Sequence, residues 1–251
     1  MPAREMDIKP NTNHVAPKTS TGEELSNELI ELEIHRQKQL MQATIDGQEK
    51  ERLEMGKELH DNINQHLNTT RLYLEVAREK ATGEVKEMID FSHKSLVGII
   101  DQIRCLSQSL VPPSLGDIGL IESIHDISDS LIRTHKFNID FFHRHFSEEG
   151  LPDKMKLMFF RITQEQITNI IRHSEAQHVQ IKLESDAENI ILTIADDGKG
   201  FDPNNYKKGQ GLTNIMNRAS LFNGNVEIDA AKRKGCRLTV TVPLDSSGLT
   251  E

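Results

Sequence analysis

A histidine followed by an aspartate lies in the middle of a long helix-forming segment. His60 comes directly after Leu59, one of several apolar residues spaced by three, four or seven positions, as on the buried side of a helix. One residue is about 100° of helix rotation, so His60 is expected at the edge of the apolar stripe. Asp61 follows, and Gln65 lies just over one turn later. The segment therefore presents a reactive imidazole on a rigid rod, with a carboxylate and a carboxamide nearby.

A second polar set lies on a predicted helix over residues 154–173. Glu165, Asn169 and His173 are each four residues apart, so they share one face of that helix. A carboxylate, a carboxamide and an imidazole in a row suit a Mg²⁺-phosphate site, because Mg²⁺ prefers a few hard oxygen ligands together with phosphate. A solvated polar face remains the alternative interpretation of these three residues.

Glycines follow at two further places. Asp196 is expected at the end of a strand, where its carboxylate can accept a hydrogen bond from an amino group such as that of adenine. Gly198 and Gly200 come next and allow the backbone to approach a ligand closely. An ordinary Asp-Gly turn is the alternative, and the second glycine favours the ligand. Gly209 and Gly211 open a predicted helix, whose N-terminal N–H groups can bind phosphate.

The elements that must position these residues begin with two helices. One long helix is predicted over residues 23–80, with Thr21 as its N-cap and a possible bend near Gly47. After a turn at 81–83, a second helix over residues 84–110 ends before two prolines. Two helices joined by a short turn lie antiparallel and leave apolar surface exposed. A second copy would cover this surface in a four-helix bundle, so we expect a homodimer.

The pattern changes after Pro113. Strand and helix patterns alternate, which predicts a mixed α/β layer with helices on one face of a sheet. The predicted helices are residues 120–134, 154–173 and 211–222, and the predicted strands are residues 137–142, 179–183, 190–195, 226–229 and 238–242. The predicted fold class is thus α+β: a long helical hairpin that forms a dimeric four-helix bundle, followed by an α/β sandwich.

The order of these motifs resembles a known superfamily. The residues 165–173, 196–200 and 209–212 match the N-box, G1 and G2 boxes of the GHKL (Bergerat) ATP-binding domain, found in gyrase, Hsp90, MutL and histidine kinases. The segment 58–65 resembles the phosphoacceptor helix of sensor histidine kinases. It is similar to the subfamily in which Asp follows His and whose partners are response regulators with helix-turn-helix outputs of the NarL/LuxR type. The resemblance covers about residues 45–244.

The resemblance implies a role for each matched residue. His60 would be the phosphoacceptor, Asp61 its general base, and Gln65 the residue that orients water to dephosphorylate the regulator. Asn169 would hold Mg²⁺, with Glu165 ordering the site, and Asp196 would bind the adenine amino group of ATP. The remaining nucleotide-binding residues would be His173, Gly198, Gly200, Gly209, Gly211 and Leu212.

The activity implied is that of an ATP-dependent, autophosphorylating protein-histidine kinase. It would pass the phosphoryl group to an Asp of a response regulator in two-component signalling and act as a phosphatase toward that regulator. One departure is Cys236, where the family usually has Thr, and a thiol is the weaker hydrogen-bonding group. A degenerate kinase that serves as a dimeric scaffold is one alternative. A GHKL ATPase or anti-sigma-type Ser kinase is the other, and it gives no role to His60.

Composition limits the partners and the location. A net charge of -9 argues against nucleic acid as a partner. No apolar run reaches the roughly 18–20 residues of a membrane span. Two distant cysteines indicate no disulfide framework, so we expect a cytoplasmic setting, with Cys105 as a small core residue. An upstream sensor could be a separate protein. The predicted domains are a disordered leader (1–22), a dimerisation and phosphotransfer domain (23–114), an ATP-binding domain (115–246) and a tail (247–251).

Overall fold

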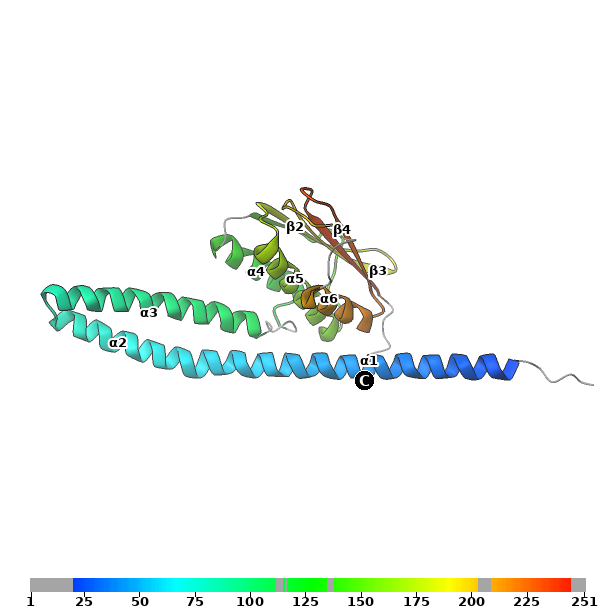
Figure 1. The fold of residues 1–251 in the computed structure, drawn as a ribbon, viewed down its shortest axis with the longest axis horizontal. Coiled ribbons are helices and arrows are strands. Elements are labelled where there is room, and N and C mark those ends of the chain that lie inside the picture. The colour runs from blue at the N-terminus through cyan, green and yellow to red at the C-terminus, as the bar shows by residue number, and fades with distance from the viewer. Residues whose placement is uncertain (1–19, 112–114, 116, 135–137, 203–208, 245–251) are drawn as a thin grey trace, which may run out of the picture. The chain divides into compact units, whose positions relative to one another are not determined.

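The computed structural model describes residues 20–111, 115, 117–134, 138–202 and 209–244 (Figure 1). The chain divides into two units, residues 1–40 and 41–251, which we describe separately. Most of the predicted disordered leader and all of the predicted tail beyond residue 246 lie outside the described residues. No described helix is both long enough and apolar enough to cross a membrane.

The first unit contains the start of helix α1, which runs from Ser20 to Glu58. Because the helix already includes Thr21, the prediction that this residue is the N-cap is wrong. Leu25, Leu29 and Leu32 form a short apolar series on this part of the helix, and all three are exposed.

The helix changes from α to π geometry at His60. After α1 ends at Glu58, a π-helical turn, η1, covers Leu59–Ile63, and α2 continues over Asn64–Lys80. The N–H of Asn64 donates to the carbonyl of Leu59, five residues back rather than four. A π turn inside an α-helix often marks a functional position. The α-helix is continuous through Gly47, and the change from α to π geometry lies at His60.

Helix α3 (Gly83–Leu110) returns antiparallel along α2, as predicted. Its end is held close to α1, because the buried hydroxyl of Ser107 donates to the carbonyl of Gly56 at 2.9 Å. A Cβ atom at Gly56 would lie 2.5 Å from a methyl carbon of Val111, so a glycine is needed at this crossing. Cys105 is exposed, and its prediction as a core residue is wrong. It lies on α3 away from the buried Leu96.

The hairpin leaves a large apolar surface open. None of the residues of α2 is buried, and α3 buries few of its apolar side chains. The exposed apolar residues of the two helices are Leu72, Tyr73, Val76, Val85, Met88, Phe91, Ile99 and Leu106. A water-soluble helix pair rarely leaves so many large apolar groups uncovered unless another surface binds them.

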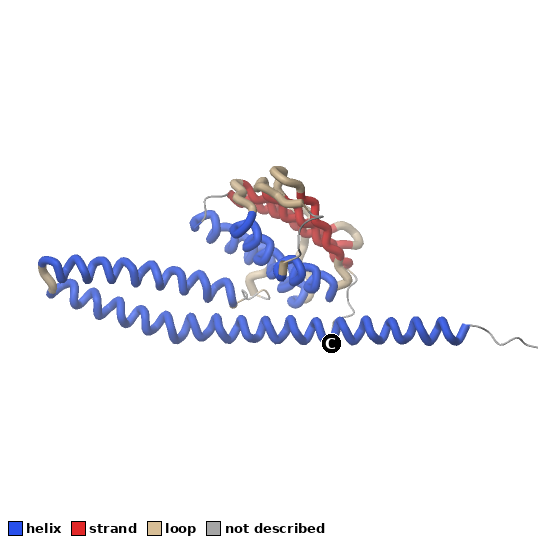
Figure 2. The backbone as a smooth tube through the Cα atoms, in the orientation of Figure 1, coloured by secondary structure: helices blue, strands red, loops and turns tan. Residues whose placement is uncertain are grey.

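The rest of the chain forms a five-stranded sheet with helices on one face (Figures 1 and 2). The strand order is β1-β2-β3-β5-β4; β1 is parallel to β2 and the other pairs are antiparallel. The elements are α4 (Leu120–Thr134), β1 (Asn138–Phe142), α5 (Asp153–His173), β2 (His178–Ser185), β3 (Asn189–Asp196), α6 (Gln210–Leu221), β4 (Asn225–Ala230) and β5 (Cys236–Pro243). The α+β architecture predicted from the sequence is confirmed.

Strict alternation along the strands explains why this sheet has one covered face. In β3, every second residue from Ile190 to Asp196 is buried, and β2 and β5 show the same period of two. These side chains meet the apolar stripe of α5, which includes Phe159, Ile162 and Ile170. Position 137, the predicted start of β1, lies outside the described residues.

A buried ion cluster joins three helices. Glu49 of α1 contacts Arg161 of α5 and Arg218 of α6, each at 2.7 Å. Arg161 also donates to the carbonyls of Ser109 and Leu110 at the end of α3. Burial lowers the pKa of the Arg161 guanidinium from its ordinary value, and the neighbouring Glu49 carboxylate acts in the opposite direction. Each group of the cluster therefore depends on the others for its hydrogen bonds.

Replacing Glu49 with glutamine should destabilise the protein, because two largely buried guanidinium groups would lose their counter-charge. We expect the free energy of unfolding to fall by about 3 kcal/mol. The matched control is Glu54→Gln, which removes an exposed carboxylate of the same helix and should change stability by less than about 0.5 kcal/mol. Urea unfolding followed by circular dichroism measures both, and equal stability of the two variants would contradict the expectation.

Candidate functional site

His60 and Asp61 are in direct contact within the π turn. The His60 Nδ1 atom lies 2.9 Å from the Asp61 Oδ1 atom, and about 70% of each side chain is exposed. An ionised carboxylate can only accept a hydrogen bond, so Nδ1 carries the proton in this contact. The Nε2 atom then keeps its lone pair and is free to act as a nucleophile. Gln65, in the first turn of α2, is also exposed.

The predicted polar face of α5 meets the first turn of α6, at Gly211. A Cβ atom added at Gly211 would lie 2.5 Å from Glu165 Oε1 and 3.0 Å from Asn169 Oδ1. Two side-chain oxygens of α5 thus converge on the N-terminal turn of α6. The Nδ2 atom of Asn169 is buried without a hydrogen-bond partner among the described residues. His173 is exposed at the last residue of α5, one turn after Asn169, and its role in nucleotide binding stays a prediction.

Asp196 is the buried aspartate at the end of β3. Its Oδ1 atom accepts a hydrogen bond from the Gly198 N–H at 3.0 Å. A Cβ atom at Gly198 would lie 2.3 Å from the carbonyl oxygen of Ser174, and the backbone of Gly200 has a φ of +56°. Burial raises the pKa of the Asp196 carboxyl, while the Gly198 amide acts in the opposite direction. Both G1-box glycines are therefore required by the close packing of this turn.

The neighbouring aspartate has a structural role. Asp197 Oδ1 accepts hydrogen bonds from the N–H groups of Gln177 and His178, at 2.8 and 2.9 Å. Burial acts to raise the pKa of Asp197, but these amide hydrogen bonds outweigh it, so the net shift is downward. The Oδ1 atom of Asp197 is therefore already used by two backbone amides. Asp196, in contrast, is buried and faces the layer between the sheet and the helices.

Cys236 lies beside Asp196. The two residues are directly paired in the register of β3 and β5. Burial, with a smaller contribution from the carboxylates of Asp196 and Asp229, raises the pKa of the Cys236 thiol to about 12. The thiol is therefore neutral at physiological pH and adds no charge to the Asp196 environment.

The start of α6 completes the group of nucleotide-binding residues predicted from the sequence. Gly209 is the residue before the helix, with φ -72° and ψ 168°, and no side chain caps the helix there. Free N–H groups at such a terminus are suited to phosphate. Leu212 is buried against the core. Residues 203–208, between the two glycine boxes, lie outside the described residues.

The buried ion cluster was not predicted from the sequence. Arg161 interrupts an apolar run between Phe160 and Ile162, and it lies one turn before Glu165 on the same helix. That interruption was a usable signal that a buried charge needs a partner. Its partner, Glu49, is 112 residues away in sequence, and no spacing pattern indicates such a contact.

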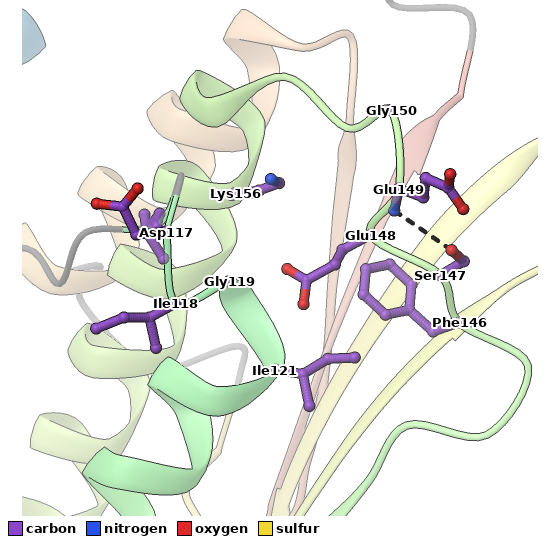
Figure 3. A pocket seen from close by; sticks show the side chains of 11 residues that line it. Asp117, Ile118, Gly119, Ile121, Phe146, Ser147, Glu148, Glu149, Gly150 and Lys156 are labelled. Carbon is purple, nitrogen blue, oxygen red and sulfur yellow. Dashed lines mark hydrogen bonds between the residues drawn. The ribbon is translucent and has the colours of Figure 1, made fainter.

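A separate open pocket of about 520 Å³ lies at the start of α4 (Figure 3). The Glu148 carboxylate points to the helix end, and its Oε2 atom accepts a hydrogen bond from the N–H of Leu120 at 2.5 Å. The lining residues include Asp117, Phe146 and Lys156 and none of the predicted nucleotide-binding residues. Glu148 therefore already occupies one N–H group of this helix terminus.

Two families of known proteins match this chain. Residues 51–115 match a family described as "Histidine kinase". Residues 155–246 match a family described as "Histidine kinase-, DNA gyrase B-, and HSP90-like ATPase". The first range contains the His60–Asp61 pair, and the second contains Asn169, Asp196 and both glycine boxes.

Individual proteins are also similar to this chain. The chain is 30% identical over 257 residues to the oxygen sensor histidine kinase NreB of Staphylococcus carnosus, covering 94% of this chain and 73% of NreB. It is 26% identical to the signal transduction histidine-protein kinase/phosphatase UhpB of Salmonella typhimurium, covering 86% of this chain and 43% of UhpB. A solved blue-light activated histidine kinase of Erythrobacter litoralis has a TM-score of 0.46 and 13% identity, covering 73% of this chain and 62% of the other.

The raised pKa of Cys236 predicts a slow reaction with thiol reagents. A pKa of about 12, against an ordinary 9.0, reduces the thiolate fraction at pH 8 about a thousandfold. In a Cys105→Ser variant, iodoacetamide should therefore modify the folded protein about a thousandfold more slowly than the urea-unfolded protein. The Cys236→Ser variant, which keeps the exposed Cys105, should react at similar rates in both states. Rapid labelling of folded Cys236 would contradict the predicted environment.

Proposed function

This chain belongs to the histidine kinase family, as a sensor kinase of a two-component system, and we propose that His60 is the residue it phosphorylates. The observation that carries this proposal is the exposed imidazole whose Nδ1 atom is held by Asp61. His66, the other histidine near the start of α2, has no carboxylate in hydrogen-bond contact within the described chain. The contact with Asp61 thus supports His60, rather than His66, as the proposed nucleophile.

The alternatives have less support. The hypothesis of a non-catalytic scaffold rests on Cys236, which replaces the Thr usual in the family. The neutral thiol, however, leaves the Asp196 carboxylate and both glycine boxes in place. A Ser kinase or plain ATPase would share the nucleotide-binding residues and leave the His60–Asp61 contact without a role. The named relatives are histidine kinases, and one is also named a phosphatase.

ATP fits the polar residues between α5, β3 and α6. Asp196 would accept a hydrogen bond from the adenine amino group, and the N-terminal turn of α6 would receive the phosphates. Asn169 Oδ1, with Glu165 nearby, would hold Mg²⁺, which typically takes one or two protein ligands and completes its shell with phosphate and water. The buried, unpaired Nδ2 of Asn169 and the close approach at Gly211 support this assignment. Bound Mg²⁺ would offset negative charge on the phosphates.

Phosphoryl transfer would use the orientation of the imidazole. The Nε2 lone pair of His60 attacks the γ-phosphorus in line; the new N–P bond forms as the bond to the ADP oxygen breaks. The ring becomes positively charged, and the Asp61 carboxylate at Nδ1 stabilises that charge. The phosphoryl group then passes to an aspartate of a response regulator. Gln65, exposed in the next turn, would orient water for the reverse task of dephosphorylating the regulator.

The partners follow from the same arrangement. The exposed apolar residues of α2 and α3 support the predicted homodimer, since a second hairpin would cover them. The response regulator would bind where His60 is exposed. A separate upstream sensor and the cytoplasmic location stay predictions from the sequence.

The test of the proposed function is autophosphorylation with radiolabelled ATP and Mg²⁺. The wild-type chain should acquire an acid-labile label, and His60→Gln should acquire none. Asp61→Asn should label roughly a hundredfold more slowly, because the imidazole loses its orienting and charge-stabilising carboxylate. His66→Gln is the matched control and should label like the wild type. A His60→Gln protein that still labels would exclude His60 as the phosphoacceptor.

The homodimer can be tested on α3. Ile99→Glu places a charge in the exposed apolar surface and should weaken dimerisation at least about thirtyfold. Lys94→Glu is the control, because it lies five residues earlier, about 140° around the helix. Sedimentation velocity over a concentration series measures the dissociation constant. A wild-type monomer at all concentrations, or equal dissociation constants for the wild type and Ile99→Glu, would contradict this surface.

A further inference from the structure

Gln166 is a buried polar residue that the proposed mechanism does not use. Only 4% of it is exposed, yet its Oε1 atom has no hydrogen-bond partner in the described part of the chain. A buried carboxamide oxygen without a partner weakens the fold, because it has lost water and gained nothing in return. Such a group requires an explanation, and a missing ligand is one.

Helix α5, which carries Gln166, connects the two halves of the nucleotide site. Gln166 lies next to Glu165 and three residues before Asn169, both of which meet Gly211. Further along, at the end of the same helix, is Ser174, whose carbonyl accepts the Lys199 N–H at 2.7 Å. Gln166 therefore belongs to the helix that meets both the first turn of α6 and the turn that follows Asp196.

Gln166 and Asp196 also face the same layer. Asp196 continues the buried series of β3, which includes Leu192 and Ile194, and α5 packs against this strand. Gln166 belongs to the buried residues of α5, four positions before Ile170. Gln166 and Asp196 are both buried where α5 packs on β3, and these two polar groups mark the place where a polar planar ligand would insert.

We infer that Gln166 is a base-recognition residue that binds the N6–N7 edge of adenine while Asp196 binds the other hydrogen of N6. The inference rests on the proposed nucleotide site. The adenine amino group has two hydrogens, one on the N1 side and one on the N7 side. Asp196 accepts the first; Gln166 Oε1 accepts the second, and its Nε2 donates to N7.

The same contact selects adenine over guanine. Guanine has two acceptors on this edge, O6 and N7, whereas a carboxamide offers one acceptor and one donor. Rotating the amide by 180° exchanges its two atoms and leaves one acceptor facing another in either orientation. Gln166 thus supplies a second reason, besides Asp196, for the base specificity of this site.

The test is a double-mutant cycle between the protein and the nucleotide. Calorimetry measures the binding of ATP and of 7-deaza-ATP, which lacks the N7 acceptor, to the wild type and to Gln166→Leu. Wild-type protein should bind 7-deaza-ATP about tenfold more weakly than ATP. Gln166→Leu should bind ATP about tenfold more weakly than the wild type does and should not distinguish the two nucleotides.

Gln180→Leu is the matched control, because its side chain lies on the opposite face of β2 from the buried Val179 and Ile181. It should keep the wild-type preference for ATP over 7-deaza-ATP. Nucleotide-free Gln166→Leu should also unfold at a higher temperature than the wild type, since the unpaired oxygen is gone. Gln166→Met, an unbranched apolar replacement, gives the same cycle if the leucine variant does not fold.

Two outcomes overturn the inference, and they are distinguishable. If the wild type binds neither nucleotide, the proposed function fails and this inference fails with it. If the wild type binds ATP but the penalty for 7-deaza-ATP is the same in the wild type and in Gln166→Leu, the nucleotide site stands. Gln166 then makes no contact with N7.

Discussion

The arrangement of the proposed nucleotide-binding residues depends on one carboxylate. Glu49 binds Arg161 and Arg218, which belong to the two helices that meet at Gly211, α5 and α6. Arg161 lies one turn before Glu165 on α5, and Arg218 lies two turns after Gly211 on α6. The position of Glu165 relative to Gly211 therefore depends on buried charged groups that lie one to two helical turns away. Removing any one member of this cluster is strongly unfavourable, because the other charged groups would remain buried and unpaired.

Local pattern made much of this fold predictable. Alternation in β2, β3 and β5 and the apolar stripe of α5 each depend on side-chain period alone, so their positions were predicted to within a few residues. The chemistry at the ends of elements was predictable for the same reason. Asp196, Gly198 and Gly211 are next to the strand or helix that positions them, and their close contacts involve backbone.

The features that could not be predicted depend on long-range contacts or on small changes in winding. The π turn at Leu59–Ile63 has the same composition as an α-helical turn, and only the Asn64 N–H bonding to Leu59 distinguishes it. Cys105 is a residue type that is often buried, but helical periodicity alone could not show that it faces outward.

Within the ATP-binding domain, buried polar atoms without hydrogen-bond partners distinguish residues with a proposed role in ligand binding from residues with a structural role. Asp197 has its Oδ1 bound by two amides and lies in an ordinary turn, whereas Asn169 and Gln166 keep buried polar atoms without partners. A sequence selected only for stability would remove those atoms, since each costs about 1–3 kcal/mol. Both residues belong to one helix, α5, which also meets the first turn of α6. In the proposed function, the nucleotide would supply the missing hydrogen bonds, so the same groups that weaken the empty domain would stabilise the loaded one.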